Sequence, residues 1–363
     1  MEVFDQVVAG GHEQVVFCHD RSTGLRAIIA VHSTVLGPGL GGTRFHPYPD
    51  ESAALLDVLR LSRGMTYKNA AAGLDLGGGK AVLIGDPGAD RTEALIRAYA
   101  RFVDSLGGRY LTAEDVGTGQ ADMDLIHRET PFVTGTSESL GGSGDPSPAT
   151  AFGVLHAMYA VADHLWGSPS LDGRHVTVAG VGKVGAALVR HLVEVGAKVT
   201  VADVDDAKVR AAVDAHGVAS APADRVHSVP CDIHAPCALG AGLNARTIPE
   251  LACAAVCGSA NNQLAEQADA QRMVDAGVLY APDYVVNAGG VINIAEELRG
   301  YDRARAWERI TEIRRTTATV LEVAASDGVT TAAAADRLAE ARIEAIGAVQ
   351  RIRTAGRARG GVR

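Results

Sequence analysis

The fold of this chain is decided by one stretch, His175-Val-Thr-Val-Ala-Gly180-Val-Gly182-Lys-Val-Gly185. The residues before Gly180 predict a strand, and the apolar spacing from Lys183 to Val195 predicts a helix that ends at Gly196. The three glycines suit a tight turn, a close approach of a pyrophosphate to the backbone, and close packing of the helix on the strand. The N-terminus of that helix offers free amides and a partial positive charge to phosphates. The stretch therefore predicts a dinucleotide-binding turn.

An acidic residue follows this turn at the spacing of an NAD site. Asp203 lies at the end of the next apolar run, about twenty residues after the glycines. A carboxylate at this position accepts hydrogen bonds from a free ribose 2′-hydroxyl and repels a 2′-phosphate. The pattern predicts NAD, and not NADP, as the cofactor. The alternative, a turn whose glycines serve packing alone, leaves Asp203 without a role.

The residues around this turn alternate between strand and helix patterns. Helices are predicted over 183–195 and 206–216, and strands over 175–179, 198–202, 231–235, 254–257 and 284–286. Such alternation is typical of a parallel, doubly wound sheet. Two long helices are predicted to follow over 302–326 and 331–352, separated by Asp327-Gly328.

The first third of the chain mixes strands and helices in a different order. Apolar runs over 14–18 and 25–33 predict a hairpin, and helices are predicted over 52–64 and 91–106. The run Gly141-Gly-Ser-Gly-Asp-Pro-Ser-Pro148 is rich in turn formers and is typical of a link between domains. In it, Ser147 suits a helix cap and Pro148 the first helical position.

Composition and charge argue against several classes of protein. A net charge of −9 gives no support for nucleic-acid binding, which needs a clustered basic face. No run of about eighteen apolar residues is present, so no membrane span is expected, and the acidic start Met1–Asp5 is unlike a signal peptide. The five cysteines lack a metal-binding spacing and no His-Glu-x-x-His occurs, so we expect a reduced, cytoplasmic protein without a metal site.

Three charged residues form the candidate catalytic group. Lys68 and Lys80 lie in the run Gly64–Lys80, where Gly77-Gly78-Gly79 leaves no side-chain bulk beside Lys80 and would let a small substrate approach the backbone. Asp115 follows an apolar start in a short loop. Two ammonium groups and a carboxylate suit binding of a small anion and movement of its protons. The alternative is a pair of solvated surface lysines.

Taken together, these motifs give the chain a resemblance to the amino-acid dehydrogenases that act on glutamate, leucine, valine and phenylalanine. The resemblance runs from about Gly11 to about Ile352 and is strongest to the branched-chain members. It rests on Leu36-Gly-Pro-Gly-Leu40-Gly-Gly-Thr-Arg44, the run Gly64–Lys80, Thr112-Ala-Glu-Asp115-Val-Gly-Thr118, Gly258-Ser-Ala-Asn261-Asn262-Gln-Leu264 and Ala281-Pro-Asp-Tyr-Val-Val-Asn287-Ala-Gly-Gly290. Their joint occurrence in this order is highly specific.

The resemblance implies a role for each candidate residue. Lys68 would hold the substrate carboxylate with help from Asn262, Lys80 would activate the reacting water, and Asp115 would be the acid/base. The substrate side chain would lie against Leu40, Gly41, Ala113, Val291 and Ile294, for which ordinary core packing is the alternative. The cofactor would be bound by Gly180, Val181, Gly182, Lys183, Val184, Gly185, Asp203, Thr150, Cys237, Ala238, Ala260, Asn261 and Asn287.

The resemblance also implies two α/β domains separated by a cleft. Residues 1–145 would form a substrate-binding, catalytic and oligomerisation domain, and residues 146–329 a Rossmann-type NAD-binding domain. A helix over about 330–353 would pack back on the first domain, and residues 354–363 would be a flexible tail. A homo-oligomer, dimer or octamer, would form through the N-terminal domain.

The implied reaction is NAD-dependent, reversible oxidative deamination of a branched-chain L-amino acid. Valine is the favoured substrate, with leucine and isoleucine close behind, and the products are the 2-oxo acid, ammonia and NADH. Glutamate is expected to be poor, because burying its second carboxylate against Leu40 and Ile294 would cost several kcal/mol. Two alternatives stay open: a phenylalanine dehydrogenase, which would share these catalytic residues, and a non-catalytic NAD-binding regulator, which would not need them.

Overall fold

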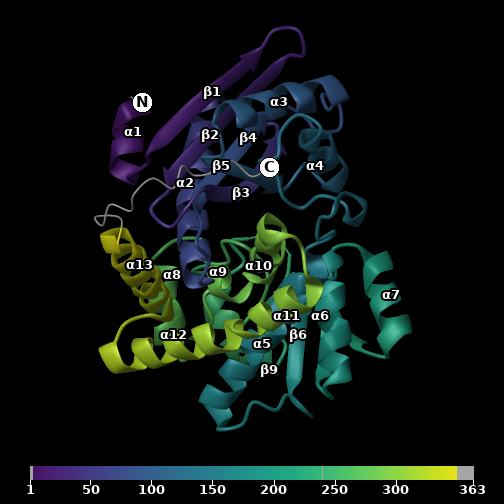
Figure 1. Cartoon of the computed structure of the whole chain (residues 1–363). Coiled ribbons are helices and arrows are strands. Elements are labelled where there is room, and N and C mark those ends of the chain that lie inside the picture. Colours follow the sequence, from purple (N-terminus) through teal and green to yellow (C-terminus); the bar gives the residue numbers. More distant parts are fainter. Residues whose placement is uncertain (1–2, 239, 350–363) are drawn as a thin grey trace. The chain divides into compact units, whose positions relative to one another are not determined.

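The computed structural model describes residues 3–238 and 240–349, and the chain divides into two compact units (Figure 1). The first unit contains the residues up to Asp145, the segment Ile294–Asp302 and the end of the last helix from Ala339 onward. The second contains Pro146–Asn293 and Arg303–Leu338. The segment Ile294–Asp302, expected in the second domain, thus belongs to the first unit.

The first unit is built on a five-stranded sheet of order β1-β2-β4-β3-β5. Its strands are β1 Gln14–Asp20, β2 Leu25–Ser33, β3 Gly39–His46, β4 Gly77–Ile84 and β5 Tyr110–Glu114. The predicted hairpin is β1 and β2, which pair antiparallel, and β2 is also antiparallel to β4. Since β4, β3 and β5 run parallel, their carboxyl ends meet at one edge of the sheet.

Helices cover both faces of this sheet (Figure 1). They are α1 Val3–Gly10, α2 Glu51–Ala71, α3 Glu93–Ser105, α4 Gln120–His127 and the short η1 Glu138–Leu140. On one face Ile29, Tyr99 and Met123 belong to a buried cluster with α3 and α4. On the other, Ile28 and Val58 belong to a cluster with α2. Each fully buried aliphatic side chain contributes about 1.5–3 kcal/mol to folding.

Helix α2 is longer than its sequence predicted. It begins after Asp50, whose carboxylate accepts a hydrogen bond from the Ala53 amide, and it continues through Gly64. Glycine inside a helix costs about 1 kcal/mol relative to alanine. Burial of the final turn, including Ala70, outweighs that cost. As a result Lys68 lies on a helix and not in a loop.

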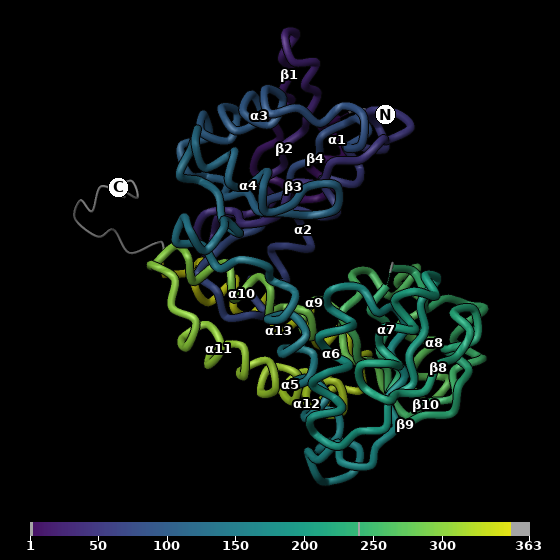
Figure 2. The backbone as a smooth tube through the Cα atoms, turned by 90° about the vertical axis from the view of Figure 1, so that its right-hand side faces the viewer, coloured from purple at the N-terminus to yellow at the C-terminus, as the bar shows by residue number. Residues whose placement is uncertain are grey.

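The second unit contains a six-stranded, fully parallel sheet of order β11-β10-β9-β6-β7-β8. Figure 2 labels β8, β9 and β10 of this sheet. Its strands are β6 His175–Ala179, β7 Lys198–Ala202, β8 Ala219–Ser220, β9 Cys231–Pro236, β10 Cys253–Val256 and β11 Leu279–Tyr280. The chain winds outward from β6 to β8, returns to β9 and winds outward again to β11. This doubly wound order places a topological switch point between β6 and β9.

The helices of this unit are α5 Ser147–Trp166, α6 Lys183–Glu194, α7 Asp206–His216, α8 Asp269–Asp275, α9 Asp283–Val286, α10 Gly289–Ala295 (whose last residues belong to the first unit), α11 Arg303–Thr311, α12 Ile313–Asp327 and the first half of α13 Thr331–Val349. Short helical turns are η2 Val226–Ser228, η3 Ile248–Glu250 and, in the first unit, η4 Glu296–Arg299. The second half of α13 packs in the first unit, where Ala339 lies against Leu36 and Ala70.

Three local predictions are wrong. The expected strand over 284–286 is helix α9, closed by a bond from the Asn287 amide to the Asp283 carbonyl at 2.9 Å, because three β-branched or aromatic residues are too few to set a period. Ser147 is the first helical residue of α5 and not its cap. The predicted helix over 302–326 is interrupted between α11 and α12 at Glu312.

Two further expectations concern membranes and the C-terminus. Among the helices of residues 3–238 and 240–349, none is long and apolar enough to cross a bilayer. The end of the predicted helix, 350–352, and the tail 354–363 lie outside the described residues.

Candidate active site

The register of the parallel strands places key residues of the first unit on one face of the sheet. Leu40 of β3 pairs with Gly78 of β4 and with Leu111 of β5. Because side chains alternate along a strand, Lys80 and Ala113 share the face of Leu40. Helix α2 packs on this face. An ammonium group thus lies beside apolar side chains on adjacent strands.

A buried ion pair joins Lys80 to Asp115. Lys80 Nζ contacts Asp115 Oδ2, and Lys80 is only 7% exposed. The Asp115 amide donates to Thr118 Oγ1 at 3.0 Å, and this hydroxyl donates to the Thr43 carbonyl at 2.8 Å. The loop that carries the carboxylate is thereby tied to β3.

A missing side chain on the middle strand lets Asp115 reach Lys80. Strand β3 lies between β4 and β5, and its residue Gly42 is level with Lys80 in the register. A Cβ on Gly42 would lie 2.9 Å from Asp115 Cβ and would overlap the Glu114 carbonyl. Glycine at position 42 is therefore a requirement of the ion pair.

Two cations keep Asp115 in its ionised form. Burial alone would raise the pKa of this carboxyl, but Lys80 and Arg44 outweigh burial and hold the pKa below its ordinary value. Arg44 Nε lies 3.6 Å from the same oxygen, Asp115 Oδ2. At neutral pH the site therefore offers a carboxylate that can accept a proton beside an ammonium that can donate one.

Sequence reasoning gave Arg44 no role, although a signal was present. Because side chains alternate along a strand, positions 40, 42 and 44 of β3 share one face of the sheet, and the buried Leu40 shows that this face is covered. A charged residue at the third of these positions must have a partner. Arg44 has two, because its Nη1 donates to Asp57 Oδ2 at 2.9 Å and its Nε approaches Asp115.

The three glycines before Lys80 do not open space for a substrate, so the predicted reason for them is wrong. Neighbouring protein already fills the space, because a Cβ on any of the three would overlap other atoms. The overlapping groups are the Ser33 carbonyl for Gly77, the Thr66 amide for Gly78 and the Tyr110 ring for Gly79. The glycines let β4 pack closely against β2, α2 and a tyrosine.

Lys68 is positioned by the end of α2. It lies in the last turn of this helix and is partly buried, and the helix packs against the strand that carries Lys80. Binding of the substrate carboxylate by Lys68 stays a prediction. Its placement on a helix follows from the unexpected length of α2.

The residues predicted for the side-chain pocket are buried apolar groups. Leu40 is 0% exposed and Ala113 3%, and Ile294 is 9% exposed in the same unit. Val291 is equally buried but belongs to the second unit. A Cβ on Gly41 would lie 2.9 Å from Met65 Cγ, which makes Met65 an apolar neighbour that the sequence did not suggest. Core packing explains the burial of these residues equally well.

The glycine turn of the second unit satisfies three separate requirements. Gly180 has a φ of +103°, a backbone conformation that favours glycine. A Cβ on Gly185 would overlap the Gly180 carbonyl, so this glycine allows close packing of α6 on β6. Around the Cβ position of Gly182, by contrast, no atom of the described residues other than its two chain neighbours lies within 4 Å. Gly182 is where a phosphate could approach, and the turn therefore fits a dinucleotide.

This turn lies at the switch point of the sheet. A Cβ on Gly180 would lie 2.8 Å from the Ala238 amide nitrogen, and the Cys237 amide donates to the Ala179 carbonyl at 2.7 Å. The loops after β6 and β9 are thus in contact. Dinucleotides bind at such a crevice in doubly wound sheets.

Asp203 supports the glycine turn directly. Its Oδ2 accepts a hydrogen bond from the Val181 amide at 2.8 Å, and its Oδ1 accepts one from the Asp205 amide at 3.0 Å. Burial would raise the pKa of Asp203, but these amides outweigh it and lower the pKa. The carboxylate therefore orders the loop in addition to its predicted contact with the ribose.

The other predicted cofactor residues lie in two places of the second unit. Asn287 Nδ2 donates to Asn261 Oδ1 at 2.8 Å, and the Ala260 amide donates to the Pro236 carbonyl at 2.9 Å, next to the end of β9. Thr150 lies against Gly290, where a Cβ would lie 2.6 Å from Thr150 Oγ1.

Asn262 adopts an unusual backbone conformation. Its φ is +51°, in the left-handed region, where the only other non-glycine residue of 3–238 and 240–349 is Ala241. Asparagine tolerates this region better than most residues. Such strain is concentrated at functional sites, which supports a role for Asn262.

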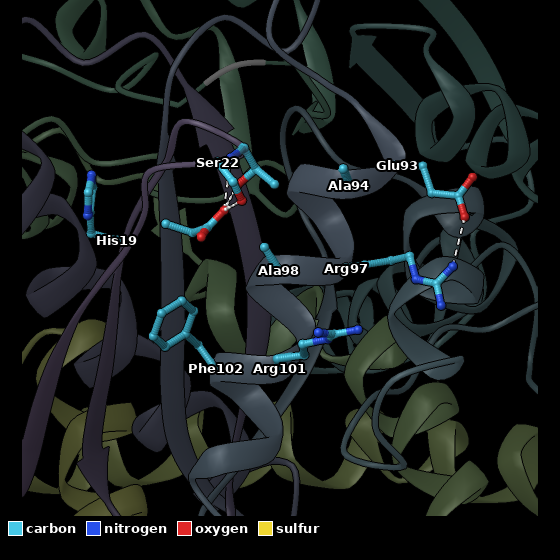
Figure 3. Close-up of a pocket in the computed structure, with 10 residues that line it drawn as sticks. His19, Ser22, Glu93, Ala94, Arg97, Ala98, Arg101 and Phe102 are labelled. Carbon is cyan, nitrogen blue, oxygen red and sulfur yellow. Dashed lines mark hydrogen bonds and ion pairs between the residues drawn. The ribbon is translucent and has the colours of Figure 1, made fainter.

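One pocket of the first unit is lined by residues other than those predicted for the site. A pocket of about 680 Å³ on the first unit lies between the β1–β2 turn and α3 (Figure 3). Arg97, one of its lining residues, donates hydrogen bonds to Glu93 and to Glu129. The pocket lining includes His19, Arg101 and Phe102 and none of the predicted site residues. Within the described part of the chain, no group of three or more His, Cys, Asp and Glu side chains could hold a metal ion.

Comparison with protein families matches both units. The model of the Glu/Leu/Phe/Val dehydrogenase dimerisation domain matches residues 12–132. The Glutamate/Leucine/Phenylalanine/Valine dehydrogenase model matches residues 141–212 and 201–360.

Individual proteins match over nearly the whole chain. The leucine dehydrogenase of Bacillus cereus is 52% identical over 346 residues, covering 95% of this chain and 94% of its own. The valine dehydrogenase of Streptomyces virginiae is 56% identical over 337 residues, with 92% and 94% covered.

Among solved structures, L-tryptophan dehydrogenase from Nostoc punctiforme superposes with a TM-score of 0.83 at 45% identity, covering 94% of this chain and 99% of its own. Glutamate dehydrogenase from Thermus thermophilus shares the fold, with a TM-score of 0.78 at 24% identity over 94% and 91% of the two chains.

Proposed function

This chain belongs to the Glu/Leu/Phe/Val dehydrogenase family and is an amino-acid dehydrogenase. We propose that it catalyses the reversible oxidative deamination of a branched-chain L-amino acid. The substrate is valine, leucine or isoleucine, and the products are the 2-oxo acid, ammonia and reduced cofactor. The observation that carries the proposal is the buried Lys80–Asp115 ion pair on the same sheet face as Leu40 and Ala113.

We propose a distinct task for each charged residue. Lys68 holds the substrate carboxylate, and Asn262 assists it. Lys80 Nζ orients the water that replaces the amino group and takes up or returns its proton. Asp115 Oδ2, in contact with Lys80 Nζ, passes protons to and from the departing ammonia. The permanent charge of Arg44 beside Asp115 keeps this carboxyl ready to accept a proton.

The nicotinamide cofactor, when bound, supplies the hydride-accepting chemistry of this reaction. A family of dehydrogenases implies such a cofactor, and the open position at Gly182 fits its pyrophosphate. We propose that the cofactor is NAD, because a carboxylate at Asp203 repels the 2′-phosphate of NADP. The turn Gly180–Gly185 and Cys237, Ala238, Ala260, Asn261, Asn287 and Thr150 would hold it.

The apolar residues proposed to contact the substrate favour an aliphatic side chain. Leu40, Ala113 and Ile294 offer no partner for a second carboxylate, so glutamate would leave a buried charge unpaired. One methylene is worth about 1–3 kcal/mol in an apolar site, and valine, leucine and isoleucine differ by one methylene or by its placement, so these residues by themselves do not rank the three substrates. The likeness to a tryptophan dehydrogenase makes aromatic amino acids, phenylalanine included, the second candidate class.

We propose that the chain assembles with copies of itself through the first unit. Strand β1 is an edge of the sheet, and Phe17 on this strand is 56% exposed. Phe4 and Val8 of α1 are 81% and 75% exposed. Large exposed apolar side chains beside an edge strand are typical of an interface. The family model that matches residues 12–132 is that of a dimerisation domain, which supports this choice. We also propose a reducing cytoplasmic location, because all five cysteines are free thiols.

The decisive experiment combines two variants with a substrate panel. Lys80→Ala and Asp115→Asn should each lower kcat by about 10²- to 10⁴-fold, the usual contribution of acid–base catalysis, while NADH still binds. The wild-type protein should reduce NAD faster than NADP and should prefer branched-chain over aromatic amino acids. Near-normal turnover in either variant would refute the assigned role, and a preference for phenylalanine or tryptophan would replace the branched-chain proposal.

A further inference from the structure

A second cation approaches the proposed acid/base from the strand beside it. Arg44 is on β3 and shares the sheet face of Lys80. Its Nε lies 3.6 Å from Asp115 Oδ2, the oxygen that also contacts Lys80. That Nε–H is buried, and among the described residues it has no hydrogen-bond partner. A buried donor without a partner is costly, so one is expected to reach it in some state of the enzyme.

Arg44 is held in place from its other end. Its Nη1 donates to Asp57 Oδ2 at 2.9 Å, and the Tyr48 hydroxyl donates to the same oxygen at 2.6 Å. The other oxygen of Asp57 accepts from Arg60 at 3.2 Å. The guanidinium therefore keeps its position whether or not Asp115 touches it. The carboxylate can move toward a fixed donor.

Proton transfer at Lys80 removes the partner of Asp115. When the N–H bond of Lys80 breaks and its proton moves to the substrate or to water, the electron pair stays on Nζ and the amine is neutral. A neutral amine no longer compensates the carboxylate, and an uncompensated buried carboxylate takes up a proton. Arg44 cannot lose its charge under these conditions. It is the group that can keep Asp115 ionised at that moment.

We propose that Arg44 is a positioning residue that receives the Asp115 carboxylate through Nε–H whenever proton transfer breaks the Lys80–Asp115 ion pair. The movement is small, because the separation of 3.6 Å needs to shorten only to the ~2.8 Å of a charge-assisted hydrogen bond. Asp115 then alternates between two cations on neighbouring strands. This inference rests on the roles of Lys80 and Asp115 proposed above.

The charges that face Asp115 support this assignment. Burial raises the pKa of Asp115, and the opposing contributions come from Lys80 on β4 and Arg44 on β3. Tyr110 of β5 also interacts electrostatically with the Asp115 carboxylate. The pKa of Tyr110 rises to about 12, mainly because the side chain is buried, so Tyr110 carries no charge at neutral pH. Arg44 is thus a cation whose charge persists through the reaction.

The test compares Arg44→Met with Arg60→Met. Both arginines form an ion pair with Asp57. The Arg60 side chain is 61% exposed, and its ion pair is with Asp57 Oδ1 and not with Asp115. Replacing Arg60 should therefore leave kcat unchanged. Arg44→Met should lower kcat by about 10- to 100-fold, the size of the loss when a reacting group is misplaced by about 1 Å. It should also move the acidic limb of the pH profile of kcat upward by about one unit or more, because a neighbouring cation has been removed.

A shift of the acidic limb separates a positioning role from a structural one. The proposal is wrong if a lower melting temperature fully explains the activity that Arg44→Met loses and if the pH profile of kcat stays that of the wild type. Should Arg44→Met fail to fold, Arg44→Lys decides. It retains the charge but not the Nε–H, so the proposal requires a lowered kcat with the acidic limb near its wild-type position. A wild-type kcat in Arg44→Lys would overturn it.

Lys80→Ala, measured in parallel, distinguishes this inference from the proposed function. If Lys80→Ala keeps turnover, both are wrong. If Lys80→Ala loses turnover while Arg44→Met has a wild-type kcat and pH profile, the proposed function stands and the role of Arg44 is rejected. Retained NADH binding, followed by fluorescence, checks that the second unit is intact in every variant.

Discussion

Two glycine clusters in this molecule look alike in sequence and do opposite things in space. Gly77-Gly78-Gly79 on β4 is surrounded by protein, and a Cβ on any of the three would overlap neighbouring atoms. In the turn after β6, Gly180 and Gly185 are constrained in the same way, but Gly182 faces open space. The first cluster is glycine-rich so that the chain can pack against itself. The second keeps one position clear for a ligand.

The difference shows that a glycine run does not by itself mark a binding site. The cluster on β4 lets α2 and β4 lie close together and thereby positions Lys68 and Lys80, the residues for which we propose roles in substrate binding and catalysis. The turn after β6 acts directly, because its backbone is the proposed contact surface. Three substitutions can break or sharpen this contrast.

The largest effect is expected for Gly78→Ala. The new Cβ would overlap the Thr66 backbone amide, and neither α2 nor β4 can move without disturbing the core around them. Overpacking costs about 1–3 kcal/mol and more where backbone must shift, so we expect a loss of about 3 kcal/mol or more in the free energy of unfolding. Urea unfolding followed by circular dichroism measures it. A fully stable Gly78→Ala protein would mean that the space around β4 is not filled.

A smaller and different effect is expected for Gly182→Ala. Its φ of −68° suits alanine and nothing in the described chain crowds the new methyl group, so the free energy of unfolding should change by less than about 0.5 kcal/mol. The methyl group would instead occupy the position proposed for the pyrophosphate. NADH affinity should fall by about 10- to 100-fold, or roughly 1.4–2.7 kcal/mol. Fluorescence titration checks this, and unchanged affinity would remove Gly182 from the cofactor site.

The smallest effect is expected for Asp203→Asn, which tests whether the carboxylate supports the turn. Losing two charge-assisted bonds from a partly solvated group should cost about 0.5–1 kcal/mol at pH 7. The pKa of Asp203 is lowered in the folded protein, so this stabilisation is fully present above about pH 4, the unfolded pKa of aspartate, and is lost as the pH falls through the lower folded value.

The difference between wild-type and Asp203→Asn stability should therefore shrink as the pH falls below about 4. Urea unfolding at pH 7 and at pH 3 measures both ends of this range. A difference that is constant with pH would show that the carboxylate does not stabilise the turn through its charge. Asp214→Asn, which removes an exposed acid of α7 away from this loop, controls for the general effect of removing a negative charge.

Sequence patterns predicted the second unit more completely than the first. The strand, turn and helix from His175 to Glu194, the next strand to Ala202 and the helix Asp206–His216 all depend on residues close in the chain, and all were found. The strand expected over 284–286 was wrong, since so short a run has no reliable period. The end of α2 was also misplaced, because burial of its last turn, which depends on distant residues, overrides the local preference of Gly64.

The candidate site divides in the same way. Lys80, Asp115 and the glycine turn stand out in the sequence because their residue types suit the chemistry. Arg44 and Gly42 do not, because their importance depends on which strands are neighbours. The strand order β4-β3-β5 puts Gly42 of β3 between Lys80 and Asp115, so that the Asp115 carboxylate can reach Lys80. The same order places Arg44 of β3 beside Asp115.

By itself, the sequence determined the fold class, the nucleotide turn, the acid at Asp203 and the residue types of the catalytic group. These follow from local periodicity, from φ requirements and from side-chain chemistry, which depend on neighbouring residues in the sequence and not on how the chain folds. Tertiary structure decided which glycines are surrounded by other atoms and which one has free space beside it. It also decided that Lys68 lies on a helix and that Asp115 has two cationic neighbours. Such contacts join residues far apart in the chain, and their geometry is set by the strand register and by the packing of α2, which no short stretch of sequence contains.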